Sequence, residues 1–303
     1  MSATPTRAAI ASVCAALLLG GLKAYAAWTT GSVAMLASLS DSLLDLIASL
    51  VTLAGVRIAA QPADANHRFG HGKAEALAAL FQVVLISASA TFIAVRAIER
   101  LTSGDVAADP EAGIIVSVIA IGVTLALTAY QARAIAASGS IAIRTDRLHY
   151  QSDLLLNAGV IAALVLESVL HLRGADPLFG IGIALWLLWG AWHAAIDAIG
   201  QLMDREWPEE KRRAFIACAA AIPGFESLHD LRTRTSGSQD FAQFHIHVPA
   251  TMSVAEAHDV VEALELRLEA EFPGTEILIH VDPEGQVDRP GEPLREANEL
   301  GGP

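Results

Sequence analysis

Residues 32–56 read SVAMLASLSDSLLDLIASLVTLAGV, and Asp41 and Asp45 are the only charged side chains in this run. A helix that crosses the hydrocarbon core of a bilayer needs about 20 mostly apolar residues. The run is long enough to span a membrane. Charged side chains inside a membrane are costly and usually functional, so the two aspartates are the first candidates for a functional site.

Five further segments share this length and apolar character. They are Ala8–Trp28, Ala74–Ile98, Ala112–Tyr130, Leu148–Leu170 and Leu178–Leu202. The short turn Thr29-Thr30-Gly31 predicts that the first two spans form a hairpin. The pattern predicts an α-helical membrane protein, with a six-helix transmembrane domain over residues 1–207 that is embedded in a lipid bilayer.

Composition and charge agree with a membrane protein. The chain is 53% hydrophobic and only 17% charged, whereas soluble domains are about 25% charged. Eight Lys and Arg residues lie near the span ends on one side and three on the other. Because positive residues favour the cytoplasmic side, we predict a multi-pass inner-membrane protein with both termini in the cytoplasm.

The last third of the chain has a different character. From Pro208 onward there are 18 acidic and 8 basic residues, which argues against nucleic acid as a partner and suits a domain that meets cations. Its periodicity predicts a small cytoplasmic α+β domain of order αββαβ over residues 208–285, and a disordered tail over 286–303. The predicted elements are a helix at Pro208–Ala220, strands at Asp230–Thr235 and Phe241–Val248 joined by a turn at Ser236-Gly237-Ser238, a helix at Ser253–Phe272 and a strand at Thr275–Val281.

Two pairs of ionisable residues stand within predicted spans. Asp41 with Asp45, and His149 with Asp153, are each spaced four residues apart and so share one helix face. If these faces meet, three carboxylates and one imidazole form a tetrahedral ligand set for a metal such as zinc. A proton relay remains an alternative. A structural ion-pair network is a weaker interpretation than metal binding, because we expect no Lys or Arg near these positions.

The loop between the second and third spans holds Asp64, His67 and His71. Their spacing fits one face of a helix, but Gly70 and Gly72 favour a turn. Two histidines in a polar loop are more often solvated than bound to metal.

Five of the 10 histidines fall in the last third of the chain. Alternation places His245 and His247 on the non-core face of one strand, and His280 and Asp282 on that of another. His229 precedes the first predicted strand and His258 lies early on a helix. These groups could bind zinc, although histidines on a polar face are more often simply exposed.

Together these residues resemble the cation diffusion facilitator family, and in particular its bacterial zinc and ferrous-iron efflux branch. The resemblance covers nearly the whole chain and rests on the two four-residue pairs, on QPADANHRFGHGKAE over residues 61–75, and on HDLRTRTSG from His229. It implies a metallochaperone-like cytoplasmic domain. It also implies three metal sites: a transport site at Asp41, Asp45, His149 and Asp153, a loop site at Asp64, His67 and His71, and a binuclear zinc site at a dimer interface at His229, His245, His258, His280 and Asp282.

The function implied is export of a divalent metal from the cytoplasm in exchange for protons, by alternating access, in a homodimer. Zinc and ferrous iron are the expected cargo, with cadmium a further candidate. Zinc is also expected as a structural or regulatory ion, with no organic cofactor. The chain is not expected to be an enzyme, since it lacks the HExxH of metalloproteases and a Walker motif. A membrane-anchored metal sensor that binds but does not transport remains the alternative.

Overall fold

The computed structural model describes residues 3–30, 33–103, 111–170 and 175–285. The chain forms two compact units, Met1–Ile199 and Gly200–Pro303. The expected disordered tail, 286–303, lies outside the described residues.

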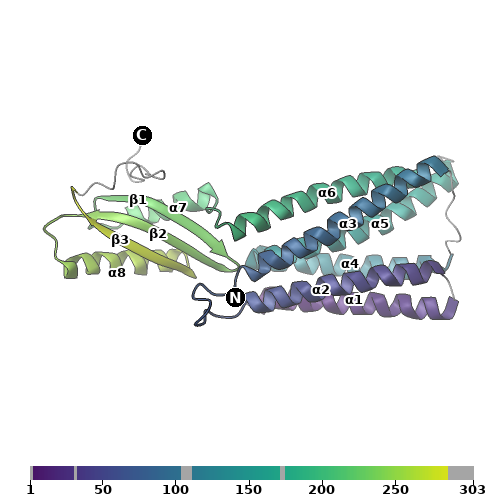
Figure 1. Ribbon diagram of the computed structural model, residues 1–303, viewed down its shortest axis with the longest axis horizontal. Helices are drawn as coiled ribbons and strands as arrows, with labels where there is room; N and C mark the ends of the chain where they lie inside the picture. The colour runs from purple at the N-terminus through teal and green to yellow at the C-terminus, as the bar shows by residue number, and fades with distance from the viewer. Residues whose placement is uncertain (1–2, 31–32, 104–110, 171–174, 286–303) are drawn as a thin grey trace. The chain divides into compact units, whose positions relative to one another are not determined.

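The first unit is built from six long helices (Figure 1). These are α1 (Ala3–Thr30), α2 (Val33–Ala59), α3 (Ala74–Ser103), α4 (Glu111–Ser138), α5 (Ile141–Leu170) and α6 (Ala175–Leu202). Over the residues that the structure describes, all six predicted spans are therefore helical, and most helices continue beyond the apolar run into more polar sequence. The backbones of α1 and α2 lie side by side, as the short turn between them predicted.

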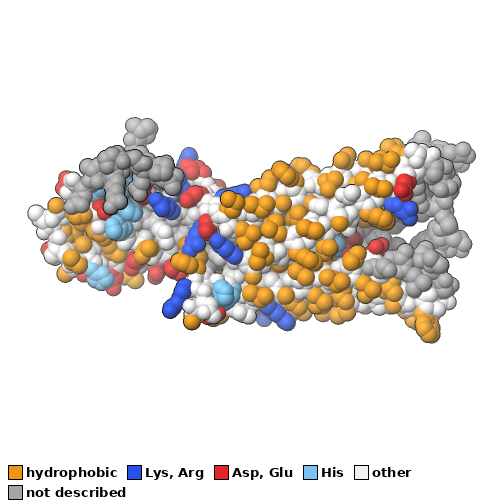
Figure 2. Space-filling model, in the orientation of Figure 1, with side chains coloured by type: hydrophobic (Ala, Val, Ile, Leu, Met, Phe, Trp, Pro, Cys, Tyr) orange, Lys and Arg blue, Asp and Glu red, His pale blue; other side chains and the backbone are white. Residues whose placement is uncertain are grey.

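Five of these helices contain a described stretch that is long and apolar enough to cross a membrane. The stretches are Thr4–Thr29, Asp41–Ala59, Ala74–Glu99, Val118–Ser138 and Pro177–Leu202. The remaining helix, α5, carries Arg144, Asp146, Arg147 and Asp153 in its first half. Figure 2 shows apolar side chains covering much of the visible face of the helical unit. This unit is a helical transmembrane domain.

Small side chains let the helices approach closely, as is common between transmembrane helices. One core cluster joins Ala8 and Ala9 of α1 to Val56, Ala78 and other buried residues of α2 to α5. At Gly55 a Cβ atom would lie 2.5 Å from the Cβ of Ala78. Only glycine therefore fits where α2 crosses α3.

The second unit alternates helices and strands in the predicted order. Its elements are α7 (Glu209–Ala220), β1 (Ser227–Ser236), β2 (Gln239–Val248), α8 (Val254–Glu271) and β3 (Thr275–Pro283). The sheet order is β1-β2-β3, with β1 antiparallel and β3 parallel to β2. The predicted hairpin turn lies between β1 and β2, where Gly237 has a φ of 62°.

Both helices cover one face of this sheet. Phe215 of α7 and Leu264 and Leu268 of α8 are fully buried with Phe244 and Ile246 of β2. The alternation predicted for β2 is thus confirmed, because Ala242, Phe244, Ile246 and Val248 all enter this core. Its intervening residues lie on the opposite face, where the histidines gather.

A β-bulge in β1 changes the position expected for His229. His229 pairs with His245, but Arg232 pairs with Gln243, so one extra residue is inserted between the pairs. Asp230 has a φ of 51° there. The bulge allows Leu228 and Leu231 both to enter the core. His229 was predicted to precede the first strand, and that was wrong, because β1 begins at Ser227.

Ser253 caps α8 as predicted. Its hydroxyl accepts a hydrogen bond from the backbone N–H of Glu256, and the Glu256 carboxylate accepts one from the N–H of Ser253 at 2.8 Å. This reciprocal pair is a capping box, which begins the helix at a defined residue. The backbone and hydroxyl hydrogen bonds from Ser253 also lower the pKa of the Glu256 carboxyl.

Candidate metal centres

The first candidate centre lies where α2 and α5 meet. Asp45 comes from α2, and His149 and Asp153 come from successive turns of α5. One ligand atom from each lies within 4.8 Å of the others. Nε2 of His149 is 2.9 Å from Oδ1 of Asp45. The cluster offers two carboxylates and one imidazole, a donor set that suits a borderline divalent metal.

Asp41 does not belong to this group of three in the described structure. It lies one turn before Asp45 on α2, and its side chain is exposed. The arrangement brings three of the four predicted transport-site residues together. Asp41 remains a predicted ligand.

Lys23 of α1 was not expected beside these carboxylates. Its ammonium donates a 2.7 Å hydrogen bond to the hydroxyl of Ser42, which is buried and stands between Asp41 and Asp45 on α2. The expectation that no Lys or Arg lies near the paired acids was wrong. Lys23 belongs to a different span, so local spacing gave no sign of it. The signal available was a lysine inside an apolar run.

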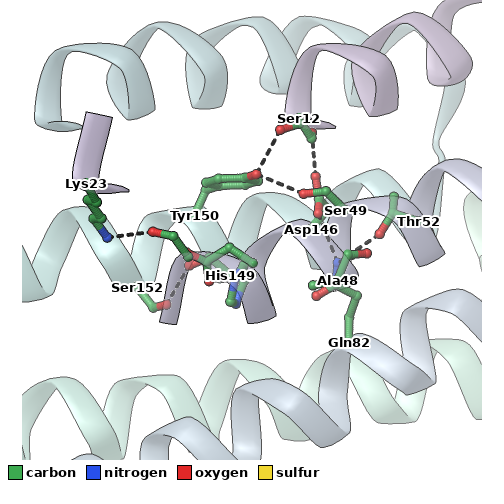
Figure 3. A network of polar contacts seen from close by, with 12 residues as sticks. Ser12, Lys23, Ala48, Ser49, Thr52, Gln82, Asp146, His149, Tyr150 and Ser152 are labelled. Atoms are coloured by element: carbon green, nitrogen blue, oxygen red, sulfur yellow. Dashed lines mark hydrogen bonds and ion pairs between the residues drawn. The ribbon is translucent and has the colours of Figure 1, made fainter. Parts of the chain in front are cut away.

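A second missed residue, Asp146, is fully buried one turn before His149. Its carboxylate accepts hydrogen bonds from Ser12 Oγ at 2.6 Å, Gln131 Nε2 at 2.8 Å and Gln82 Nε2 at 2.9 Å. These donors come from α1, α4 and α3, and Figure 3 shows Ser12 and Gln82 beside Asp146. Gln82 also donates to Thr52 of α2 at 2.8 Å. We call Ser12, Gln82, Gln131 and Asp146 the polar node.

Tyr150 extends the node on the other side of His149. Its hydroxyl donates to the carbonyl of Ser12 at 3.0 Å and lies 2.8 Å from the hydroxyl of Ser49, which then acts as donor (Figure 3). Asp146 and Tyr150 thus anchor α5 one turn before His149 and at the residue after it. This fixes the rotation of α5 and directs the imidazole toward α2.

The loop centre forms a turn rather than a helix. Oδ1 of Asp64 accepts backbone hydrogen bonds from Asn66 at 2.8 Å and His67 at 2.7 Å, and these hydrogen bonds lower the pKa of the Asp64 carboxyl. Nε2 of His71 is 3.1 Å from Nδ1 of His67 and 3.4 Å from Oδ2 of Asp64. Gly70 has a φ of 74°. The glycine signal for a turn was the better guide, and the three predicted residues converge.

The third centre lies on the open face of the sheet. Because His245 is the register partner of both His229 and His280, the three form a row across the strands. Asp282 lies beside this row, with Oδ2 2.8 Å from Nδ1 of His245 and Oδ1 3.3 Å from Nε2 of His280. Nε2 of His229 is 3.6 Å from Oδ2 of the same residue. The Asp282 carboxylate therefore lies close to all three imidazoles.

His247 was not among the predicted ligands but joins this centre. It forms a second group of three with His229 and Asp282, alongside the group of His245, His280 and Asp282. Its ring stacks on His229 with centroids 4.4 Å apart. Burial lowers the pKa of His229, and the neighbouring His247 and His245 lower it further. Strand alternation already placed His247 on this face, so the signal was present in the sequence.

His258 does not reach this centre within one chain. It is exposed near the start of α8, and α8 packs through Leu264 and Leu268 on the opposite face of the sheet. The remaining residues predicted for the cytoplasmic centre do come together on the open face.

Comparison with known proteins places both units in one family. The cation efflux transmembrane domain matches residues 9–203, and the cytoplasmic domain of cation efflux proteins matches residues 207–284. The cation-efflux pump FieF of Cronobacter sakazakii is 43% identical over 94% of each chain. FieF of Escherichia coli O127:H6 is 42% identical over 95% of each chain.

Among solved structures, the zinc form of the zinc transporter CzrB is 38% identical. The matched region covers 28% of this chain and 99% of the CzrB chain, with a TM-score of 0.25. The two domain matches and the near full-length relatives establish that the chain belongs to the cation efflux family, whose members are multi-pass membrane transporters of metal cations.

Proposed function

We propose that this chain exports a divalent transition metal, zinc or ferrous iron, from the cytoplasm in exchange for protons. The observation that carries the proposal is the convergence of Asp45, His149 and Asp153 inside the helical bundle. Ionisable residues inside a membrane domain mark ion pathways. Two carboxylates and an imidazole suit zinc and ferrous iron better than calcium or magnesium, which prefer oxygen ligands alone.

Proton exchange follows from the chemistry of the same ligands. An imidazole nitrogen must be unprotonated to bind a metal, and metal binding to such a site releases protons. Histidine has a reference pKa of about 6.5, so it exchanges protons near neutral pH. Metal and proton therefore compete for His149, and this competition is the simplest source of antiport.

Alternating access would use the way in which the cluster is built. The ligands come from two helices, so a shift of α2 against α5 would separate Asp45 from His149 and Asp153. The polar node holds α5 to α1, α3 and α4, and a shift of α2 would also break the hydrogen bonds of Thr52 with Gln82 and of Ser49 with Tyr150. We propose that opening to each side of the membrane assembles and disassembles this ligand set.

The cytoplasmic unit is proposed to form a homodimer that binds zinc as a regulatory ion. The match of residues 207–284 to the cytoplasmic dimerisation domain of cation efflux proteins supports a dimer. Four histidines around Asp282 support a site for two metals, with the carboxylate shared between them. His258 would join only from the second subunit. Asp64, His67 and His71 would form a further, exposed site, and both chain termini would lie in the cytoplasm of an inner-membrane protein.

The test is zinc and ferrous-iron uptake into everted membrane vesicles with an imposed pH gradient. Export from the cytoplasm appears as uptake that depends on an acidic vesicle interior. Collapse of the gradient should stop it, and reversal of the gradient should drive efflux. Uptake that is indifferent to the pH gradient would contradict proton antiport. The competing proposal, a membrane-anchored sensor, predicts binding without uptake in the same vesicles.

A further inference from the structure

Lys23 places a positive charge inside the transmembrane domain, within the candidate span Thr4–Thr29 of α1. A lysine near the end of a span can extend along the helix to reach water. Here the ammonium instead donates to the buried hydroxyl of Ser42, at 2.7 Å. Figure 3 shows the Lys23 side chain directed from α1 toward the other polar groups of the bundle.

The surroundings of Lys23 are acidic. Ser42 stands next to Asp41 and three residues before Asp45 on α2. Coulombic interactions connect Lys23 with Asp41 and with Asp153 of α5. A lysine inside a membrane is costly unless it is paired. The ammonium therefore sits where acids from two helices attract it, beside the cluster that contains His149.

A charge balance shows what the lysine contributes, and it rests on the transport site proposed above. With a neutral imidazole, Asp41, Asp45 and Asp153 carry three negative charges. Lys23 supplies one positive charge and a divalent metal two, so the loaded site is neutral. Without the lysine the same three carboxylates would attract the dication with no positive charge beside it. The fixed cation therefore offsets part of the attraction between the carboxylates and a dication.

We infer that Lys23 is a built-in counter-cation of the transport site, which limits how tightly a divalent metal is held and so speeds its release. A fixed positive charge repels a dication, and the repulsion is strong where water is scarce. A transport site must bind its ion well enough to load it and weakly enough to release it. Lys23 thus lowers the affinity of the site for a divalent metal, and the site keeps its full set of ligands.

The test compares initial rates of zinc uptake into everted vesicles at a series of zinc concentrations. The variants are Lys23→Met, which keeps an unbranched side chain of similar length but removes the charge, Lys23→Arg, which keeps the charge, and Asp45→Asn, which removes a proposed ligand. For Lys23→Met we expect a KM at least about tenfold lower and a fall in kcat by a similar factor. Lys23→Arg should stay within about threefold of the unmodified chain.

KM does not depend on how much variant is inserted, so a change in expression cannot mimic the result. If the KM of Lys23→Met is unchanged or higher, or if the Met and Arg variants shift it alike, charge is not responsible and the inference fails. If Lys23→Met does not transport, zinc titration of the purified full chain decides, with tighter binding expected and weaker binding contradicting it. Normal uptake by Asp45→Asn would instead overturn the proposed transport site.

Discussion

The helical cluster of Asp45, His149 and Asp153 and the sheet-face cluster around Asp282 use the same residue types in opposite proportions. The first has two carboxylates to one imidazole, and the second has four imidazoles to one carboxylate. Their scaffolds differ as well. β2 and β3 are joined by a ladder of backbone hydrogen bonds that fixes His245 opposite His280. By contrast, Asp45 meets His149 only through a side-chain contact between two helices.

This difference in scaffold indicates which cluster can separate its ligands during a transport cycle. Moving two hydrogen-bonded strands apart would break several backbone hydrogen bonds at once, so the sheet-face cluster suits a metal that stays bound. Two helices in contact through side chains can slide or tilt at much lower cost. The helical cluster therefore suits a metal that is bound and released.

The largest effect is expected from Asp153→Asn. The substitution keeps the shape of the side chain but removes a charged ligand. Loss of a residue that only hydrogen-bonds a metal ligand already lowers metal affinity or activity by about 10–100-fold. We expect zinc uptake into vesicles to fall by more than about 100-fold. Asp197→Asn on α6, in an exposed ion pair with Arg144 outside the cluster, is the matched control and should transport nearly normally. Normal uptake by Asp153→Asn would break the comparison.

Asp282→Asn should weaken zinc binding at the sheet-face cluster and leave the helical cluster unchanged. Asp282 belongs to both groups of three ligands on the sheet face, so its loss should weaken zinc binding there by about 10–100-fold. Equilibrium dialysis of the full chain should then show fewer tightly bound zinc ions, with the transport-site ion retained. Asp259→Asn, on the exposed surface of α8, should leave the count unchanged. Loss of every bound zinc would mean that the two regions are not independent.

The polar node offers a test of what holds the helical cluster in place. Asp146→Asn replaces an oxygen that accepts hydrogen bonds with an amide that faces donors, and leaves buried groups unsatisfied. We expect a loss of about 2 kcal/mol of stability, and a smaller loss of about 1 kcal/mol for Ser12→Ala, which removes one donor. Thermal unfolding in detergent measures both. Equal melting temperatures for all three proteins would show that the node does not anchor α5.

A smaller effect is expected at the cap of α8. Ser253→Ala should destabilise the start of this helix by about 1 kcal/mol, because the backbone N–H of Glu256 loses its acceptor. Hydrogen exchange of the first turn of α8 should accelerate accordingly, whereas Ser253→Thr keeps the hydroxyl and should exchange as the unmodified chain does. Zinc uptake should be unaffected. A transport defect would show that α8 acts on the helical cluster.

The last and smallest effect is a pH dependence from one imidazole. Burial lowers the pKa of His229 in the folded state, and the unfolded value is about 6.5. Its contribution to stability is therefore fully present above pH 6.5 and is lost as pH falls through the lower folded pKa. Thermal unfolding of the metal-free chain should show less loss of stability on acidification in His229→Gln than in the unmodified chain. Identical pH profiles would contradict this assignment.

Much of the architecture follows from local patterns. Six apolar runs predicted the six long helices, and the alternation of Ala242, Phe244 and Ile246 predicted the core face of β2. Spacing of four residues predicted that His149 and Asp153 share a face. The signals were sufficient because each depends on residues within one element. The start of β1 was misplaced because the bulge at Asp230 interrupts the alternation.

The sequence by itself determined the ligand types, the faces on which they lie and the division between an apolar bundle and an acidic α+β unit. Only the tertiary structure decided which faces meet. It brought Lys23 beside Ser42, surrounded the Asp146 carboxylate with donors from three helices and left His258 outside the sheet-face cluster. The physical reason is that helix and strand periodicity act over a few residues. Contacts between helices, and the register shift at the bulge, depend on how distant segments pack.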